Sequence, residues 1–283
     1  MSLELVDKLE YHAANARRMI VRMVAAGKAG HMGGAMSCVD LLVALYFHFM
    51  QIDPQSPKMP NRDRFVMSAG HKCMAQYAVL CERGFFEPTV LDTYGQLATK
   101  LPGHPDMFKL PGVEANTGAL GHGLSIGVGM ALGLKDTYSR VFVVLGDGEL
   151  SEGSNWEAVA AAAHHKLDNL FAFVDANGLQ ISGKTKDVMN MQSMRQKFEA
   201  FGWEALEIDG NDMMALVSLL DSLPLKNGKP SAIIMNTIKG KGVSFAENQL
   251  NYHYWQPSAE ELIQAEKELD EAIQRKGAKL WTH

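Results

Sequence analysis

Five short runs of β-branched and aromatic residues, each ending in a glycine or a polar turn, constrain the fold of this chain most. Their apolar residues are continuous rather than alternating, which is the pattern of strands buried on both faces. Helical patterns separate them, so we expect an α/β fold: a doubly wound, mainly parallel sheet with helices on both faces. The runs are RFVMSAGH (64–71), RVFVVLGDG (140–148), LFAFVDANG (170–178), WEALEIDGND (203–212) and SAIIMNTIKG (231–240).

Two of the helical segments carry a start signal. The segments SNWE (154–157) and SAEE (258–261) have the S-x-x-E spacing of a capping box, in which serine and glutamate side chains satisfy free backbone N–H groups. We therefore expect helices after Ser154 and Ser258, the second being a C-terminal helix over about 258–276.

A third helical segment, GHGLSIGVGMALGLK (121–135), is rich in glycine. Its G-x-G-x-x-x-G spacing is not that of a dinucleotide fingerprint, and no clear strand precedes it, so we reject a dinucleotide site. Free N–H groups at the start of the helix favour a facing anion, with tight packing alone as the alternative. The glycines four apart, at 123/127 and 129/133, predict that another helix packs closely against this one.

Composition narrows the class of protein. The 283 residues are 47% hydrophobic, and because no repeat or linker is visible we expect a single domain over 1–283. A net charge of −5 argues against nucleic-acid binding driven by charge. The first 25 residues predict an amphipathic helix rather than a signal peptide, and the longest apolar run, LLVALYF (41–47), is too short to cross a membrane. Three cysteines without a C-x-x-C pair indicate reduced thiols in the cytoplasm.

Polar residues follow four of the predicted strands, at the edge where open parallel sheets bind ligands. They are Gly70-His71, Asp147, Asn177 and Lys239-Gly240. Asn177 comes thirty positions after Asp147, the length of one strand–helix–strand crossover, so the two side chains are expected at neighbouring strand ends. A carboxylate, an amide oxygen and a nearby carbonyl suit Mg²⁺ or Ca²⁺, with phosphate oxygens completing the Mg²⁺ shell. The alternative is that GDG and DANG are only turns.

Seven stretches, in order along the chain, resemble the N-terminal half of the transketolase family. GDGE followed by Asn177 matches the thiamine-diphosphate motif of that family. The resemblance implies a single thiamine-diphosphate-binding domain. The stretches are GKAGHMGGAMSCVDLLVALYF (27–47), SAGH (68–71), LPGHPD (101–106), TGALGHGLSIGVGMALG (117–133), GDGELSEGSNWEA (146–158), VDANGLQISG (174–183) and TIKGKGVSFAEN (237–248).

The same resemblance implies which residues hold thiamine diphosphate and its Mg²⁺ (or Ca²⁺). The metal ligands are the side chains of Asp147 and Asn177 and the carbonyl of Leu179. Glu152 matches a glutamate at the subunit interface near the activating network of the cofactor, with a first-turn residue favoured by the helix dipole as the alternative. The other cofactor contacts implied are His71, Gly118, Ala119, Leu120, Gly148, Asn177 and Lys239.

Four histidines match family positions around the reacting sugar: His31, His71, His104 and His253. Imidazole suits this role because sugar hydroxyls exchange protons near neutral pH. The family usually has glycine after the last of these histidines, whereas this chain has Tyr254, which puts the role of His253 and the choice of substrate in question.

The resemblance also implies a missing half. In the family a second domain supplies the glutamic acid that activates the cofactor and the arginines that bind the sugar phosphate, and nothing in this chain matches it. We therefore expect an N-terminal subunit of a split transketolase, inactive alone and assembled with a C-terminal partner as two copies of each. Its reaction would move a two-carbon ketol unit from a ketose phosphate to an aldose, with pentose phosphates as the default and branched or sulfonated sugars open.

Two alternative functions stay open. One is a subunit of a different thiamine-diphosphate enzyme, similar to deoxyxylulose-phosphate synthase or to a 2-oxoacid dehydrogenase. The paired histidines of SAGH and LPGHPD favour sugars over oxoacids. The other is a cofactor-binding subunit that no longer catalyses a reaction.

Overall fold

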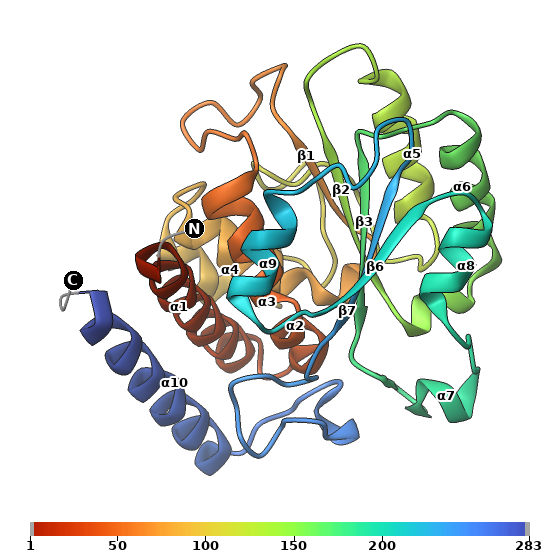
Figure 1. Ribbon diagram of the computed structural model, residues 1–283. Coiled ribbons are helices and arrows are strands. Elements are labelled where there is room, and N and C mark those ends of the chain that lie inside the picture. The colour runs from red at the N-terminus through yellow and green to blue at the C-terminus, as the bar shows by residue number, and fades with distance from the viewer. Residues whose placement is uncertain (1–2, 281–283) are drawn as a thin grey trace.

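The computed structural model describes residues 3–280. Its centre is a five-stranded sheet in the order β1-β2-β3-β7-β6, and all four strand pairs are parallel (Figure 1). Each of the five predicted runs contains one strand, so the predicted parallel sheet is confirmed. The strands are β1 (Arg64–Met67), β2 (Val141–Gly146), β3 (Leu170–Ala176), β6 (Glu204–Asp209) and β7 (Ser231–Asn236).

Burial follows the position of each strand in the sheet. Every residue of the inner strand β2 is buried, and so are all but the last residue of β3 and of β7. The edge strand β6 departs from the expectation of burial on both faces, since Ala205 is its one fully buried residue. An edge strand has a neighbour on one side only, so its other side remains open to solvent.

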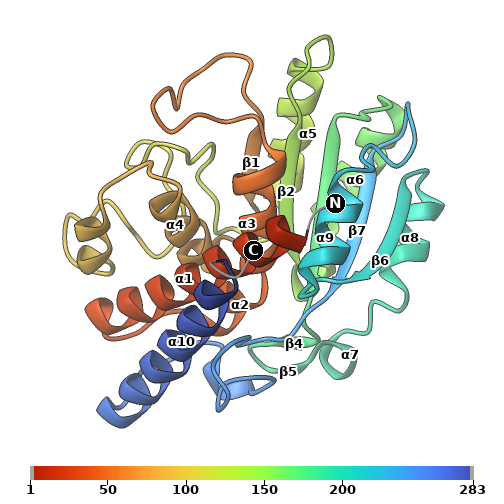
Figure 2. The same ribbon diagram turned by 60° about the vertical axis from the view of Figure 1, so that its left-hand side comes forward.

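Helices cover both faces of the sheet (Figures 1 and 2). Phe142 faces one core and Val143 the other, because successive side chains of a strand point to opposite faces. The doubly wound fold is therefore confirmed. The core around Phe142 is closed by α1 (Leu3–Gly27), α2 (Met32–Ser37), α3 (Val39–Ala44), α4 (Cys73–Glu82) and α9 (Met213–Leu220), and the core around Val143 by α5 (Gly123–Gly133), α6 (Gly153–His164) and α8 (Met194–Ala200).

Short elements connect these layers. A hairpin of β4 and β5 follows β3 and, with α7, lies below the sheet in the view of Figure 2. No helix of residues 3–280 combines the length and the apolar composition needed to cross a bilayer. The short elements are β4 (Leu179–Gln180), β5 (Gly183–Lys184), α7 (Thr185–Val188), the π-helix η1 (Leu45–Phe49), and the 3₁₀ turns η2 (Gly70–Lys72), η3 (Pro88–Thr93), η4 (Gly148–Ser151) and η5 (Leu250–Tyr252).

The two predicted capping boxes have different outcomes. The N–H of Glu261 donates to the Ser258 hydroxyl at 3.1 Å, and the N–H of Ser258 donates to the Glu261 carboxylate at 3.0 Å, so this box is confirmed. Its helix α10 spans Ala259–Leu280, beyond the expected end near 276, and lies along α1. The box at Ser154 is wrong: α6 begins at Gly153, and the Ser154 hydroxyl donates to the Gly121 carbonyl at 2.9 Å.

The first two glycines of α5 face the sheet. A Cβ placed on Gly127 would lie 2.5 Å from Cγ2 of Val143, and one on Gly123 would lie 2.4 Å from Cβ of Ser68. Gly129 and Gly133 are exposed, and outside the backbone of the helix itself the described chain has no atom within 4 Å of such a Cβ. The predicted close contact with a helix is therefore wrong for Gly123 and Gly127, which instead let α5 approach β1 and β2, and it stays a prediction for Gly129 and Gly133.

Candidate active site

The carboxyl ends of the parallel strands open into a cavity of about 350 Å³. It brings together the segments after β1, β2, β3 and β7, as expected for an open parallel sheet. Two of the predicted site residues, His104 and Ala119, do not line it. The predicted site residues that do line it are His31, His71, Gly118, Leu120, Asp147, Gly148, Glu152, Asn177, Leu179, Lys239 and His253.

Oxygen atoms from two neighbouring strand ends meet in this cavity. Asp147 follows β2, and its carboxylate accepts hydrogen bonds from the N–H groups of Gly148 at 2.9 Å and Gly178 at 2.8 Å. Because Gly178 comes directly after Asn177, the second bond holds the two predicted ligands side by side. The amide oxygen of Asn177 accepts from the N–H of Leu179 at 3.2 Å.

These donors fit a hard divalent cation. A carboxylate, an amide oxygen and the Leu179 carbonyl form an all-oxygen set, which Mg²⁺ and Ca²⁺ prefer. Among residues 3–280 no group of three or more His, Cys, Asp or Glu side chains could hold a metal, so a metal here depends on the amide and the carbonyl. Burial raises the pKa of Asp147 more than the charge of the nearby Lys72 lowers it. A bound cation would offset the free-energy cost of burying this carboxylate in its charged form.

Lys239 carries positive charge into the cavity. Its ammonium lies 2.8 Å from the carbonyl oxygen of Leu179 and 2.9 Å from Nδ1 of His253. Burial, and then the charge of Lys72, lower the pKa of Lys239 to about 8. A diphosphate in the cavity would add negative charge beside this ammonium and so oppose the lowering of its pKa.

The predicted histidines form a cluster at one side of the cavity. The ring centre of His31 lies 5.4 Å from that of His71, 5.6 Å from that of His253 and 6.4 Å from that of the exposed His104. The ring of Tyr254 meets His31 edge-on at 4.8 Å. Tyr254 therefore lies at the histidine cluster, at a position where the family usually has no side chain.

Burial keeps the imidazoles of His31, His71 and His253 neutral. It lowers the pKa of His71 to about 2 and that of His253 to about 3, and it also lowers the pKa of His31. A neutral imidazole has one nitrogen that donates a hydrogen bond and one that accepts. At neutral pH the cluster can therefore both donate hydrogen bonds to the hydroxyl groups of a ligand and accept hydrogen bonds from them.

Glu149 is a site residue that the sequence analysis did not single out. Its carboxylate is 2% exposed and accepts from the N–H groups of Gly121 and Gly146, both at 3.0 Å, and from the Ser68 hydroxyl. Burial raises its pKa. The N–H of Gly121, two residues before α5 begins, thus meets a carboxylate of the chain itself. The position of this glutamate directly after GDG was the available signal.

Lys72 and Asp175 were also missed. Their side chains form an ion pair of 2.5 Å and are 3% and 0% exposed. The signal was a single carboxylate in LFAFVDA, an otherwise apolar strand. Glu152, which was predicted, lies exposed at the rim of the cavity as the N-cap residue of α6, without a capping hydrogen bond from its side chain.

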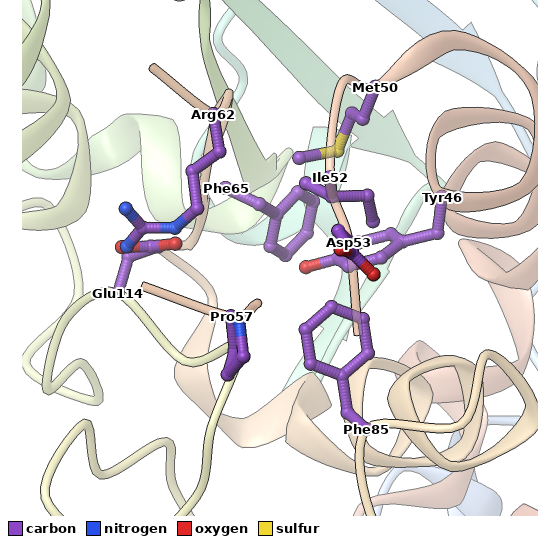
Figure 3. Close-up of a pocket in the computed structure, with 10 residues that line it drawn as sticks. Tyr46, Met50, Ile52, Asp53, Pro57, Arg62, Phe65, Phe85 and Glu114 are labelled. Carbon is purple, nitrogen blue, oxygen red and sulfur yellow. The ribbon is translucent and has the colours of Figure 1, made fainter. Parts of the chain in front are cut away.

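A second hollow lies between the 46–62 segment and the 112–114 turn (Figure 3). Phe65, Phe85 and Tyr46 surround it, and Arg62 and Glu114 form an ion pair of 2.6 Å at one side. Its volume of about 10 Å³ is the space of a single water molecule. A hollow of that size cannot hold a cofactor, and the candidate site is the cavity at the carboxyl edge of the sheet because the predicted site residues gather there.

The fold and the cavity define an α/β protein that binds its ligand at the carboxyl ends of a parallel sheet. Two lysines, four carboxylates and a histidine cluster line or adjoin that cavity. The model of the transketolase, thiamine diphosphate binding domain matches residues 9–272. The chain therefore belongs to the transketolase family and corresponds to its N-terminal, thiamine-diphosphate-binding part.

Relatives of two kinds match the chain. An apulose-4-phosphate transketolase subunit of Phocaeicola vulgatus is 45% identical over 95% of this chain and 96% of its own length. The 6-deoxy-6-sulfo-D-fructose transketolase subunit SqwG of a Clostridium species is 41% identical over 89% of this chain and 92% of its own length. Human transketolase is 37% identical over 88% of this chain, but the match covers only 40% of its length.

Solved transketolase structures share the fold. The structure from Campylobacter jejuni matches 98% of this chain with a TM-score of 0.85 and 29% identity, and the one from Leishmania mexicana matches 97% with a TM-score of 0.84 and 28% identity. The chain spans 46% of either transketolase chain.

Proposed function

We propose that this chain is the N-terminal subunit of a transketolase that depends on thiamine diphosphate and Mg²⁺ (or Ca²⁺). The enzyme transfers a two-carbon ketol unit from a ketose phosphate to an aldose. The observation that carries the proposal is that one cavity contains both an all-oxygen metal set at two strand ends and a cluster of neutral histidines. We further propose that residues 1–283 form one domain.

The proposed roles at the diphosphate end follow from charge and hydrogen bonding. Asp147, Asn177 and the Leu179 carbonyl would hold the cation, and Lys239 would bind the anionic diphosphate. The backbone at Gly118, Ala119 and Leu120, together with Gly148, would contact the cofactor. When bound, thiamine diphosphate supplies the nucleophilic carbon for carbon–carbon cleavage.

The histidines act on the sugar. His31, His71 and His253 would donate and accept hydrogen bonds with its hydroxyl groups, and His104 would close the cluster from its exposed loop. Burial lowers the pKa of His31, His71 and His253, so these three imidazoles are neutral and can hold the sugar hydroxyls by hydrogen bonds at their ring nitrogens. Orienting the hydroxyls and moving their protons is the contribution of this chain to the reaction.

A partner subunit completes the proposed enzyme. The helix α5 is apolar on all sides, yet Leu132 is 44% exposed and Gly129 and Gly133 are also exposed, which is typical of a helix buried in an assembly. Two relatives that the chain matches over 96% of their own length are named as subunits of a transketolase. We propose a heterotetramer with a C-terminal, pyrimidine-binding subunit that also binds the sugar phosphate. Three free, buried cysteines support a place in the cytoplasm.

Calorimetric titration of thiamine diphosphate into the chain at saturating Mg²⁺ tests the proposal. We expect binding by the unchanged chain and loss of binding in Asp147→Ala, with the far-ultraviolet circular dichroism spectrum retained. Asp209→Ala is the matched control, because Asp209 also ends a strand but does not line the cavity. No binding by the unchanged chain, or equal binding by Asp147→Ala, would contradict the proposed function.

A further inference from the structure

The ion pair of Lys72 and Asp175 lies directly behind the predicted metal ligands. Asp175 is the sixth residue of β3, and its carboxylate accepts from Lys72 at 2.5 Å, from the Ser37 hydroxyl at 2.6 Å and from the Thr237 hydroxyl. It also accepts from the amide nitrogen of Asn177 at 3.3 Å. Asp175 thus joins four segments of the chain at the floor of the cavity.

The contact with Asp175 orients the amide of Asn177. A carboxylate only accepts hydrogen bonds, so it turns the NH₂ group of the amide toward itself. The oxygen of the same amide then points away from Asp175 and accepts from the N–H of Leu179 at 3.2 Å. Asp175 and this N–H together therefore fix which atom of Asn177 a metal would meet.

The side chain of Lys72 reaches the cavity through space that the missing Cβ of a glycine leaves open. A Cβ on Gly34 would lie 3.1 Å from Cε of Lys72, and a Cβ on the preceding Gly33 would lie 3.1 Å from Cγ of Lys239. The two glycines at the start of α2 thus leave room for the stems of two lysines. Both ammonium groups end at the cavity, that of Lys72 beside Gly146 at the end of β2.

Burying this ion pair contributes little to folding by itself. Removing two charges from water costs about as much as their attraction returns, so buried pairs are weak evidence for a role in stability. The cavity, however, contains the carboxylates of Asp147 and Glu149, which would repel a diphosphate. Lys72 lines the cavity and Asp175 does not, so the pair presents its ammonium rather than its carboxylate to a diphosphate bound there.

We propose that Lys72 and Asp175 form a positioning pair for the cofactor site, an inference that rests on the proposed function. Lys72 supplies a buried positive charge for the diphosphate. Asp175 holds Lys72 in place and turns the amide oxygen of Asn177 toward the metal.

Three variants separate these roles: Lys72→Met, Asp175→Asn and the double variant. Lys72→Met leaves a buried carboxylate unpaired, so we expect both a lower melting temperature without cofactor and weaker cofactor binding. The double variant removes both charges, so its melting temperature returns close to that of the unchanged chain. Its affinity for thiamine diphosphate at saturating Mg²⁺ stays about tenfold or more weaker, the effect of one charge-assisted hydrogen bond.

Asp175→Asn keeps the ammonium but replaces a carboxylate, which only accepts hydrogen bonds, by an amide that can also donate, so it no longer fixes which end of the Asn177 amide faces position 175. We expect it to raise the Mg²⁺ concentration needed for half-maximal cofactor binding, with a smaller effect on cofactor affinity at saturating Mg²⁺. Arg140→Met is the matched control, since Arg140 pairs with the buried Asp63 at 2.7 Å at the opposite end of β2. It should lower the melting temperature and leave cofactor affinity unchanged.

Two results would overturn the inference: unchanged cofactor affinity in Lys72→Met, or recovery of both melting temperature and affinity in the double variant. The second would show a pair that is only structural. If Lys72→Met does not fold, the double variant is compared with the unchanged chain instead. No binding of thiamine diphosphate by the unchanged chain would instead reject the proposed function, so the two failures are distinguishable.

Discussion

At the scale of single residues, burial decides how the cavity can do chemistry. His71 and His253 are neutral because the protein around them disfavours the charged imidazolium, and the lysines nearby add to that effect. Burial lowers the pKa of Lys239 as well. The side chains of the cavity therefore carry less positive charge than their residue types alone would indicate.

The low pKa of His71 predicts how stability depends on pH. The unfolded chain binds a proton at this histidine below pH about 6.5, but the folded chain does not until pH about 2. The free energy of unfolding should therefore fall as the pH falls below 6.5, by up to about 1.4 kcal/mol per pH unit from this residue. Above pH 6.5 the contribution of His71 to the free energy of unfolding is constant.

Urea unfolding of the cofactor-free chain at pH 7.5, 6.5 and 5.5 measures this dependence. His71→Asn should flatten the loss of stability below pH 6.5, and His164→Asn, at an exposed helix end, controls for removing an imidazole. An equally steep loss in His71→Asn would show that this histidine does not remain neutral in the folded chain.

At the scale of elements, the contact of α5 with the sheet depends on its glycines. Gly127 lies against Val143 of β2, whereas Gly129 faces open space in the described chain. One helix thus has a packed side that excludes any side chain and an outer side that admits one.

Gly127→Val and Gly129→Ala should act in opposite directions. The valine has no room against Val143 and should destabilise the chain by about 1–3 kcal/mol. The alanine should stabilise the isolated chain by about 0.5–1 kcal/mol, because it restricts the unfolded backbone. Urea unfolding measures both, and a destabilising Gly129→Ala in the isolated chain would mean that this position is packed.

At the scale of the whole molecule, the proposed reaction rests on a partner subunit that we propose completes the cavity. The chain spans 46% of the solved transketolase chains it matches, and its cavity opens at the edge of the sheet. The exposed side of α5 offers a surface for a further subunit.

We expect the purified chain to show no ketol transfer from xylulose 5-phosphate to an aldose, and to gain it when co-purified with a pyrimidine-binding subunit. The assay is aldose-dependent consumption of the ketose, with Asp147→Ala in the same assembly as control. Transfer at full rate by the chain alone would refute the need for a partner. Activity of the assembly with pyruvate but not with sugars would favour the other thiamine-diphosphate enzymes.

The sequence by itself determined the architecture and the ends of the strands where ligands bind. Buried parallel strands need continuous apolar residues, and that requirement is local, so all five strands were predictable. The placement of Asp147 beside Asn177 was equally predictable, because the crossover length makes β2 and β3 neighbours. The family motifs added the histidines, most of which the structure brings together.

Only the tertiary structure decided which distant side chains share a buried volume. Lys72 meets Asp175 across 103 positions, and Glu149 accepts from the N–H of Gly121 across 28 positions. Ser154 donates to the carbonyl of Gly121 instead of capping its own helix, and Gly123 and Gly127 of α5 lie against the sheet instead of a helix. A local sequence pattern determines which element a segment can form. The contacts of a long side chain, or of a glycine without a Cβ, depend on which segments the fold places next to it.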